Sequence, residues 1–223
     1  MSEVIEKKGS IRRRTKGEKT RKQILDAAIT VLAQQGIKGT THRAVAAVAN
    51  IQLSLTTYYF KDINELVHEA FLLSAKETQA RVNSAWDQAF EVVEAIEKAQ
   101  LRKKAVREQL CNTLADMSAQ YIYHKLEEEQ EALAVEQLMF TQAKLIPELR
   151  EIALQHKQAL ITPFMKLCGY FNKKYADIDA DIMLTIYTQL EYRNLGIPVE
   201  LLDIEEIRTT TYRILALLMG VRT

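Results

Sequence analysis

The residues of this chain whose types and spacing could bind a metal are a few Glu and His side chains at helical intervals. Glu65-x-x-His68 has the spacing with which helical bundles hold paired metal ions, and His124 with Glu127 shows the reversed spacing. A di-metal site needs two Glu-x-x-His motifs, whereas this sequence contains one. The acidic residues around Glu127 also fit the solvated first turn of a helix, where negative charge favours the helix dipole. A helical-bundle metal enzyme is therefore a minor alternative, and we expect no metal and no other cofactor.

Other motifs that carry catalysis are missing from the sequence. It has no Gly-rich phosphate loop, no G-x-S-x-G nucleophile elbow and no H-E-x-x-H pair. The two cysteines, Cys111 and Cys168, stand 57 residues apart without C-x-x-C or Cys/His spacing, which argues against a zinc site or a disulfide framework. We interpret them as buried thiols and the protein as one without enzymatic activity.

The charge of the 223-residue chain is balanced overall but unevenly distributed. Residues 1–61 contain 12 Lys and Arg against 4 Asp and Glu, whereas residues 62–223 contain 18 against 25. A basic segment followed by an acidic remainder indicates an encounter with a polyanion, and nucleic acid is the first polyanion to consider. A solvated basic tail on an ordinary domain is the alternative.

Composition and hydropathy exclude several other classes of protein. With 48% apolar and 26% charged residues, the chain can bury an ordinary globular core. No apolar stretch approaches the ~18 residues that a membrane-spanning helix needs. Residues 1–19 are polar and basic and lack the apolar segment of a secretory signal. We therefore expect a cytoplasmic protein with no membrane partner.

Apolar residues recur at helical spacing along the chain, and no strand-like alternation competes, so we expect an all-α fold. Thr20–Gln23 has the form of a capping box and predicts the start of the first helix, which Gly36 would end. Asn50 tolerates a left-handed backbone and predicts a tight turn between two short helices. Asp62–Glu65 forms a second capping box and predicts the start of a longer helix.

Two short helices joined by a tight turn and braced by a third helix form a helix-turn-helix unit, whose second helix lies in the major groove of DNA. The first helix would cover residues 41–49, the turn residues 50–52, and the recognition helix residues 53–59. This arrangement predicts three segments: a basic N-terminal arm over residues 1–19, a helix-turn-helix DNA-binding domain over residues 20–61, and a larger helical domain over residues 62–223.

An ordered set of features lies between Thr20 and Leu66: Ile-Leu-Asp-Ala-Ala, Gly36, Thr40-Thr41, Ala-Val-Ala and Thr56-Thr57-Tyr58-Tyr59-Phe60. With these features the stretch resembles the N-terminal domain of the tetracycline-repressor (TetR) family. The resemblance implies an all-helical homodimer in which a small DNA-binding domain precedes a larger domain that binds an effector and dimerises. It also implies a transcriptional repressor that a small-molecule effector releases from its operator. An architectural DNA-binding protein without an effector is the alternative.

Two positions depart from the family pattern. Asn50 stands where the family often has Gly, and Asn can replace Gly in a left-handed turn at some cost. Ile63 stands where many members place a Lys toward the phosphate backbone, and Lys61 could supply that charge instead.

Contacts to phosphates set register and affinity, whereas contacts to base edges set sequence preference. The phosphate candidates are Thr41, at a helix N-terminus, and, by the resemblance, Tyr59 and Lys61. Thr41 could also be a plain helix cap, and Tyr59 could simply pack. The candidates for base contacts surround the recognition helix: Arg43, Gln52, Leu53, Ser54, Thr56, Thr57 and Tyr58. The basic arm of Arg12, Arg13, Arg14 and Lys16 suits a minor groove or phosphates, or else is a solubilising tail.

The resemblance places an effector pocket among the central helices of the larger domain. It suggests a lining of Cys111, Leu114, Met117, Met139, Phe140 and Met165, for which ordinary core is the alternative. Because methionine-rich walls adapt to irregular apolar ligands, we expect a hydrophobic or amphipathic effector.

The last two helices, expected at residues 179–194 and 204–220, carry apolar stripes that predict a homodimer. The stripes are Ile182, Ile186 and Leu190 on one helix and Ile207, Ile214 and Leu218 on the other. Two copies of this pair could assemble a four-helix bundle, and packing within one chain is the alternative.

Overall fold

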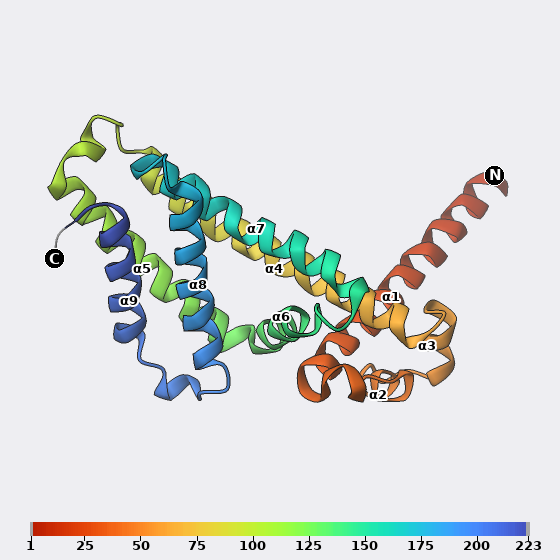
Figure 1. Cartoon of the computed structure of the whole chain (residues 1–223). Helices are drawn as coiled ribbons and strands as arrows, with labels where there is room; N and C mark the ends of the chain where they lie inside the picture. Colours follow the sequence, from red (N-terminus) through yellow and green to blue (C-terminus); the bar gives the residue numbers. More distant parts are fainter. Residues whose placement is uncertain (1, 222–223) are drawn as a thin grey trace.

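In this computed structural model the backbone is described for residues 2–221 and the side chains for residues 16–221. These residues form an all-helical fold, as the helical periodicity predicts, and no strand occurs among them (Figure 1). None of the described helices is long and apolar enough to cross a membrane. The α-helices are α1 (Ser2–Gly39), α2 (His42–Val48), α3 (Leu53–Tyr59), α4 (Ile63–Glu94), α5 (Lys104–Glu128), α6 (Gln130–Gln142), α7 (Pro147–Phe171), α8 (Ala176–Asn194) and α9 (Ile204–Leu218), with short 3-10 helices η1 (Gln100–Arg102) and η2 (Val199–Leu201).

The first helix begins earlier than the sequence predicts. Thr20 lies inside α1, where its hydroxyl donates a hydrogen bond to the backbone oxygen of Lys16 at 3.1 Å. The capping box expected at Thr20 is therefore wrong, because a residue within a continuous helix has no free turn to cap. Gly36 does interrupt the helical path, with φ 66° and ψ −175°, a conformation that glycine adopts readily.

The tight turn and the later helix caps form as expected. Asn50 has φ 51° and is the one non-glycine residue in the described part of the chain with a left-handed backbone. The Thr41 hydroxyl caps α2 by accepting a backbone N–H at 3.1 Å. Asp62 caps α4 by accepting two backbone N–H groups at 2.9 and 3.0 Å. These caps fix where the chain leaves α1 and where it enters α4.

The first of three apolar cores joins the helix-turn-helix unit to the larger domain. Ile24 and Val31 of α1, Phe60 after α3 and Phe71 of α4 are buried in it. The same core contains Met139 of α6 together with residues from the first half of α7. In Figure 1, α6 lies beside the end of the molecule that contains α2 and α3, and α4 and α7 run together away from it. The short helices α2 and α3 thus share a core with the elements that lead to the far end.

The other two cores hold the far end of the molecule together, where α5 packs against α9 and α7 against α8. Cys111 and Cys168 are both buried in the second core and form no disulfide, which confirms their interpretation as buried thiols. Burial raises the pKa of Cys111 to about 11 and that of Cys168 to about 12, so neither is reactive at neutral pH.

The apolar stripes of α8 and α9 point partly inward. Leu190 and Ile207 are each 1% exposed and pack within the chain's own third core. Their assignment to a dimer interface is therefore wrong, because a side chain already buried in its own chain offers no surface to a partner. Ile186, Ile214 and Leu218 are half-buried against the cores, whereas Ile182 is exposed. The large apolar side chains that do face outward on these helices include Ile178, Ile182 and Leu217.

Candidate DNA-binding surface and ligand cavity

The recognition helix α3 presents one polar stripe outward. Leu53, Ser54, Thr57 and Tyr58 are exposed, and Tyr58 is the most open of them at 79%. Gln52 precedes the helix without spending its side chain on a cap, so its amide is free to reach a base. Leu53 and Thr57 lie one turn apart, as do Ser54 and Tyr58, so these side chains form two neighbouring rows on the outward side of α3.

Thr56 is the exception among the candidates for base contact. It is fully buried, its hydroxyl donates to the backbone oxygen of Leu53 at 2.8 Å, and it lies 3.1 Å from Nδ1 of His42. Because the hydroxyl proton is used on Leu53, His42 must donate through Nδ1. Thr56 is therefore wrong as a base-reading residue. It instead joins α3 to α2, which sets the angle at which the recognition helix is presented.

The candidate phosphate contacts have mixed surroundings. Lys61, just after α3, is exposed, and Thr41 is exposed while also capping α2. Arg43 on α2, a candidate for base contact, is exposed as well. Tyr59 is half-buried, with its ring edge-on to Tyr58 at 5.1 Å.

Tyr59 also reaches α1. Its hydroxyl lies so near Gly17 that an added Cβ there would meet it at 3.4 Å. Lys16 is exposed on the same stretch of α1. The side chains of Arg12, Arg13 and Arg14 lie outside the described residues.

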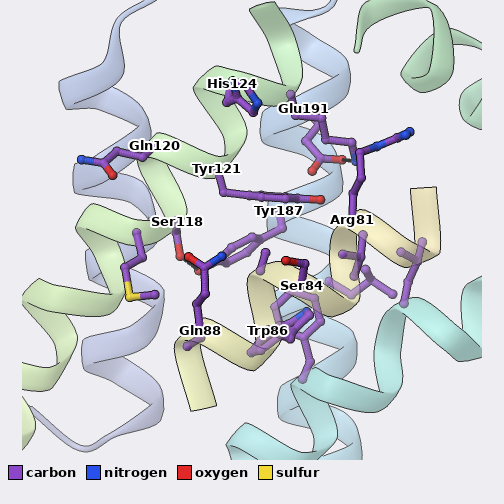
Figure 2. Close-up of a pocket in the computed structure, with 18 of the residues that line it drawn as sticks. Arg81, Ser84, Trp86, Gln88, Ser118, Gln120, Tyr121, His124, Tyr187 and Glu191 are labelled. Atoms are coloured by element: carbon purple, nitrogen blue, oxygen red, sulfur yellow. Dashed lines mark hydrogen bonds and ion pairs between the residues drawn. The ribbon is translucent and has the colours of Figure 1, made fainter. Parts of the chain in front are cut away.

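A cavity of about 520 Å³ lies in the larger domain among α4, α5, α6, α7, α8 and α9. Its apolar end is aromatic: Trp86 meets Phe164 edge-on at 4.7 Å, and Phe164 meets Tyr187 at 5.1 Å. Tyr121 extends across the cavity toward Arg81 and Glu191, as Figure 2 shows. The cavity has the size of ordinary small-molecule sites and an amphipathic lining.

The predicted pocket residues are mostly elsewhere. Leu114 and Met117 line the cavity, but Cys111 is buried with its sulfur 3.3 Å from the sulfur of Met219. Met139 is buried in the first core, and Phe140 packs against that core. Met165 is exposed on α7. These four assignments are wrong because the four side chains pack in the cores or face outward and do not line the cavity.

The charged end of the cavity contains buried ion pairs that link several helices. Lys125 on α5 pairs with Glu191 on α8 at 2.8 Å, and both are nearly fully buried. Burial opposes the charge of Lys125, but Glu191 and Glu136 outweigh it and hold the pKa of the lysine above its ordinary value. Arg81 on α4 pairs with Glu129, the residue before α6, at 2.7 Å.

Glu136 is the third carboxylate at this end. It accepts hydrogen bonds from His156 Nε2 at 2.8 Å and from the Tyr192 hydroxyl at 3.1 Å. Burial disfavours its ionisation, yet Lys125 and the hydrogen bond from His156 hold the pKa of Glu136 below its ordinary value. The cluster therefore ties α5, α6, α7 and α8 together at one end of the cavity.

The metal-site alternative finds little support in these surroundings. The Glu65 carboxylate accepts the backbone N–H of Lys61 at 2.6 Å, so it completes the turn that enters α4. Among the residues whose side chains are described, His124, Glu127 and Glu128 alone come close enough together to share an ion, and all three are exposed. His124 also lies 3.4 Å from Glu128 in an ordinary one-turn ion pair.

Comparison with known proteins finds a family model for the N-terminal segment. Residues 24–70, which cover α2, α3 and the adjoining parts of α1 and α4, match the family model described as bacterial regulatory proteins of the TetR family. These residues of the N-terminal segment thus match the TetR family. A comparison with curated proteins found no match.

Solved structures similar to this chain extend the likeness over the whole fold. A transcriptional regulator from Rhodococcus sp. Rha1 aligns with a TM-score of 0.67 and 16% identity, over 90% of this chain and 96% of that one. A member of the TetR family from Streptomyces coelicolor A3 aligns with a TM-score of 0.56 and 24% identity, over 87% and 97%. The multidrug binding protein EbrR, complexed with imidazole, aligns with a TM-score of 0.53 and 26% identity, over 87% and 93%.

The candidate DNA-binding residues predict two kinds of variant. Tyr58→Ala should change the preferred DNA sequence, because the ring is the most exposed side chain on the outward stripe of α3. Lys61→Ala should weaken binding to all sequences alike and lower the slope of log affinity against log salt by about one. Selection of binding sites with each variant, followed by fluorescence anisotropy at several salt concentrations, measures both effects.

Lys173→Ala removes an exposed lysine from the turn between α7 and α8 and serves as the matched control. Its binding should equal that of the wild type. A Tyr58→Ala protein that keeps the wild-type motif at wild-type affinity would show that the outward stripe is assigned wrongly.

Proposed function

We propose that this TetR-family protein is a transcriptional repressor whose homodimer holds a near-palindromic operator until a small molecule enters the cavity. The observation that carries the proposal is the arrangement of two sites on one long helix. Three residues separate the recognition helix from α4 (Figure 1), and α4 carries Arg81 and Trp86 into the cavity wall. The proposal includes action in the cytoplasm, where bacterial DNA lies, and no enzymatic activity.

A second connection between the two sites runs through α6. Glu129, immediately before α6, is ion-paired with Arg81 in the cavity wall. One residue into α6, the Glu131 carboxylate accepts hydrogen bonds from Thr30 at 2.8 Å and Gln34 at 3.3 Å, both on α1. A ligand that separates Arg81 from Glu129 would free the start of α6 and, through Glu131, alter its hold on the DNA-binding domain.

The experiment that tests this function combines operator selection with a ligand screen. Random DNA is selected on the wild-type protein, and the selected duplex is titrated by fluorescence anisotropy. Affinity should fall steeply as salt rises, because the basic residues release counterions from the phosphates. A metabolite that raises the melting temperature should weaken operator binding about 5- to 150-fold, and DNA should weaken metabolite binding by the same factor. Failure to enrich any sequence would refute the regulator. If every ligand that raises the melting temperature leaves operator affinity unchanged, the alternative of an architectural DNA-binding protein is favoured.

The homodimer is proposed through the outward faces of α8 and α9. We predict that Ile182→Glu combined with Leu217→Glu gives monomers in sedimentation at micromolar concentration, because the exposed apolar patch would then carry two charges. Operator affinity should fall with it, since a two-fold dimer holds half-sites about one helical turn, roughly 34 to 36 Å, or a multiple of it apart. Leu154→Glu, at a side chain 63% exposed on α7, is the control and should remain a dimer. A monomeric wild type would contradict the interface.

The α6 connection predicts a variant that separates coupling from binding. Glu131→Ala should leave operator affinity and cavity affinity within about twofold of the wild type, because Glu131 is exposed and lines neither site. The factor by which a cavity ligand weakens operator binding should fall by about threefold, a part of the usual 1 to 3 kcal/mol range of coupling. Glu127→Ala, exposed on the last turn of α5, is the control. Unchanged coupling in Glu131→Ala would leave α4 as the sole route.

A further inference from the structure

The cavity carries more negative than positive fixed charge at its polar end. Three carboxylates line it, from Glu129, Glu136 and Glu191, against the two permanent cations of Arg81 and Lys125. Each of these cations is committed to one carboxylate, Arg81 to Glu129 at 2.7 Å and Lys125 to Glu191 at 2.8 Å. The remaining carboxylate, Glu136, is held by a neutral phenol and by an imidazole that can donate its hydrogen bond without being charged.

The neighbouring groups respond to this excess. Burial raises the pKa of Glu191, and Glu136 and Glu129 add to the rise while Lys125 opposes it. Burial and the same three carboxylates raise the pKa of Tyr121 to about 12, so its phenol is neutral at physiological pH. Burial raises the pKa of Tyr187 to about 12 as well, so this phenol is also neutral, and His124 in the lining is exposed. A further positive charge at this end would relieve repulsion, and a further negative charge would add to it.

The other end of the cavity supplies surfaces suited to the body of a cation. Trp86, Phe164 and Tyr187 form a continuous aromatic cluster, and Tyr121 lies between this cluster and the carboxylates (Figure 2). Aromatic faces attract cations, and the attraction grows when both are shielded from water. A volume of about 520 Å³ admits a molecule with several rings.

We propose that the cavity binds an organic cation with a bulky aromatic or apolar body, its charge beside Glu136 and Glu191 and its body against Trp86, Phe164 and Tyr187. An anion would have to pair with Arg81 and Lys125. It would thereby separate these cations from their carboxylates and leave the three carboxylates uncompensated in a buried site. The inference rests on the proposed function only in treating this cavity as the effector site.

The test compares two ions of the same shape and opposite charge. Tetraphenylphosphonium and tetraphenylborate each carry four phenyl groups on one central atom and differ in the sign of the charge. Trp86 is the chain's single tryptophan and lines the cavity, so its fluorescence reports occupancy directly. The full-length protein without DNA should bind the phosphonium at least about tenfold more tightly than the borate. Equal or tighter binding of the borate, or no phosphonium binding up to millimolar concentration, would overturn the proposal.

Variants locate the charge that selects the cation. Glu136→Gln keeps groups that can bond Tyr192 and His156 but removes the excess charge, so phosphonium affinity should fall roughly tenfold. Glu129→Gln removes a charge from the same end at a less buried position and should act in the same direction. Glu127→Gln changes the net charge equally outside the cavity and should stay within twofold. Unchanged phosphonium affinity in both cavity variants, with melting temperatures near that of the wild type, would overturn the proposal.

The same titrations with operator DNA separate this inference from the proposed function. If the phosphonium binds and operator affinity is unchanged, the ligand class stands and the effector role fails for this cation. If the protein binds its operator and the phosphonium does not bind, the ligand class fails and the DNA-binding function stands.

Discussion

The structure depends on one constraint: the two seven-residue helices of the helix-turn-helix unit are too short to be stable by themselves. An isolated helix of that length is marginal in water, and its stability must come from packing of its apolar face. Here Val45 and Phe60 bury against Ile24 and Val31 of α1, and the same core continues into α6 and α7. The geometry of the helix-turn-helix unit is therefore set by helices that also border or approach the ligand cavity. Any rearrangement of α6 acts on the packing that holds α2 and α3 in place.

The buried charges give the larger domain its specific arrangement. Burying Lys125 and Glu191 costs desolvation free energy, and only their mutual attraction compensates that cost. Removing one partner leaves the other charge buried and unpaired, which costs about 3 to 5 kcal/mol. Each partner of this pair lies on a different helix, and Glu136 adds hydrogen bonds to α7 and α8 from α6. Apolar packing alone would tolerate sliding between these helices, whereas the paired charges allow one register. A hollow bundle in which a cavity replaces part of the core has particular need of such fixed points.

Local signals in the sequence predict most features of the helix-turn-helix unit. The left-handed Asn50 and the Asp62 cap depend on neighbours only two or three residues away, so the chain itself displays them. Thr56 was misassigned because the partner that allows a buried hydroxyl, His42, lies fourteen residues earlier across a turn. In a seven-residue helix, residue type does not say which stripe faces the core. The true start of α1 was also missed, since Thr20 has the residue type of a cap without the chain break that a cap requires.

The cavity could not be predicted in the same way. Its lining runs from Arg81 to Leu215 and comes from six helices, so it exists only after these helices have packed. One signal in the sequence does indicate a polar interior: Lys125, Glu136 and Glu191 are charged residues at otherwise inward-facing helical positions. A charge on the buried side of a helix must find a partner, and several such charges in one domain predict a polar interior. The assignment of Leu190 and Ile207 to a dimer interface is wrong for a related reason. Periodicity identifies an apolar face but does not show whether that face packs against the same chain or another.

The uninterrupted length of α4 has a mechanical consequence. It is a single 32-residue helix without an internal proline, and about twenty residues separate its start beside the recognition helix from Arg81 in the cavity wall. At 1.5 Å per residue this is a lever about 30 Å long, so a tilt of about 4° about its cavity end would displace its DNA-proximal end by roughly 2 Å. In a symmetric homodimer, the same tilt of both α4 helices would change the distance between the two recognition helices by up to twice that amount. Phosphates and base edges repeat at fixed intervals along duplex DNA, so the protein must match these positions. A displacement of this size exceeds the range of distances over which a hydrogen bond forms.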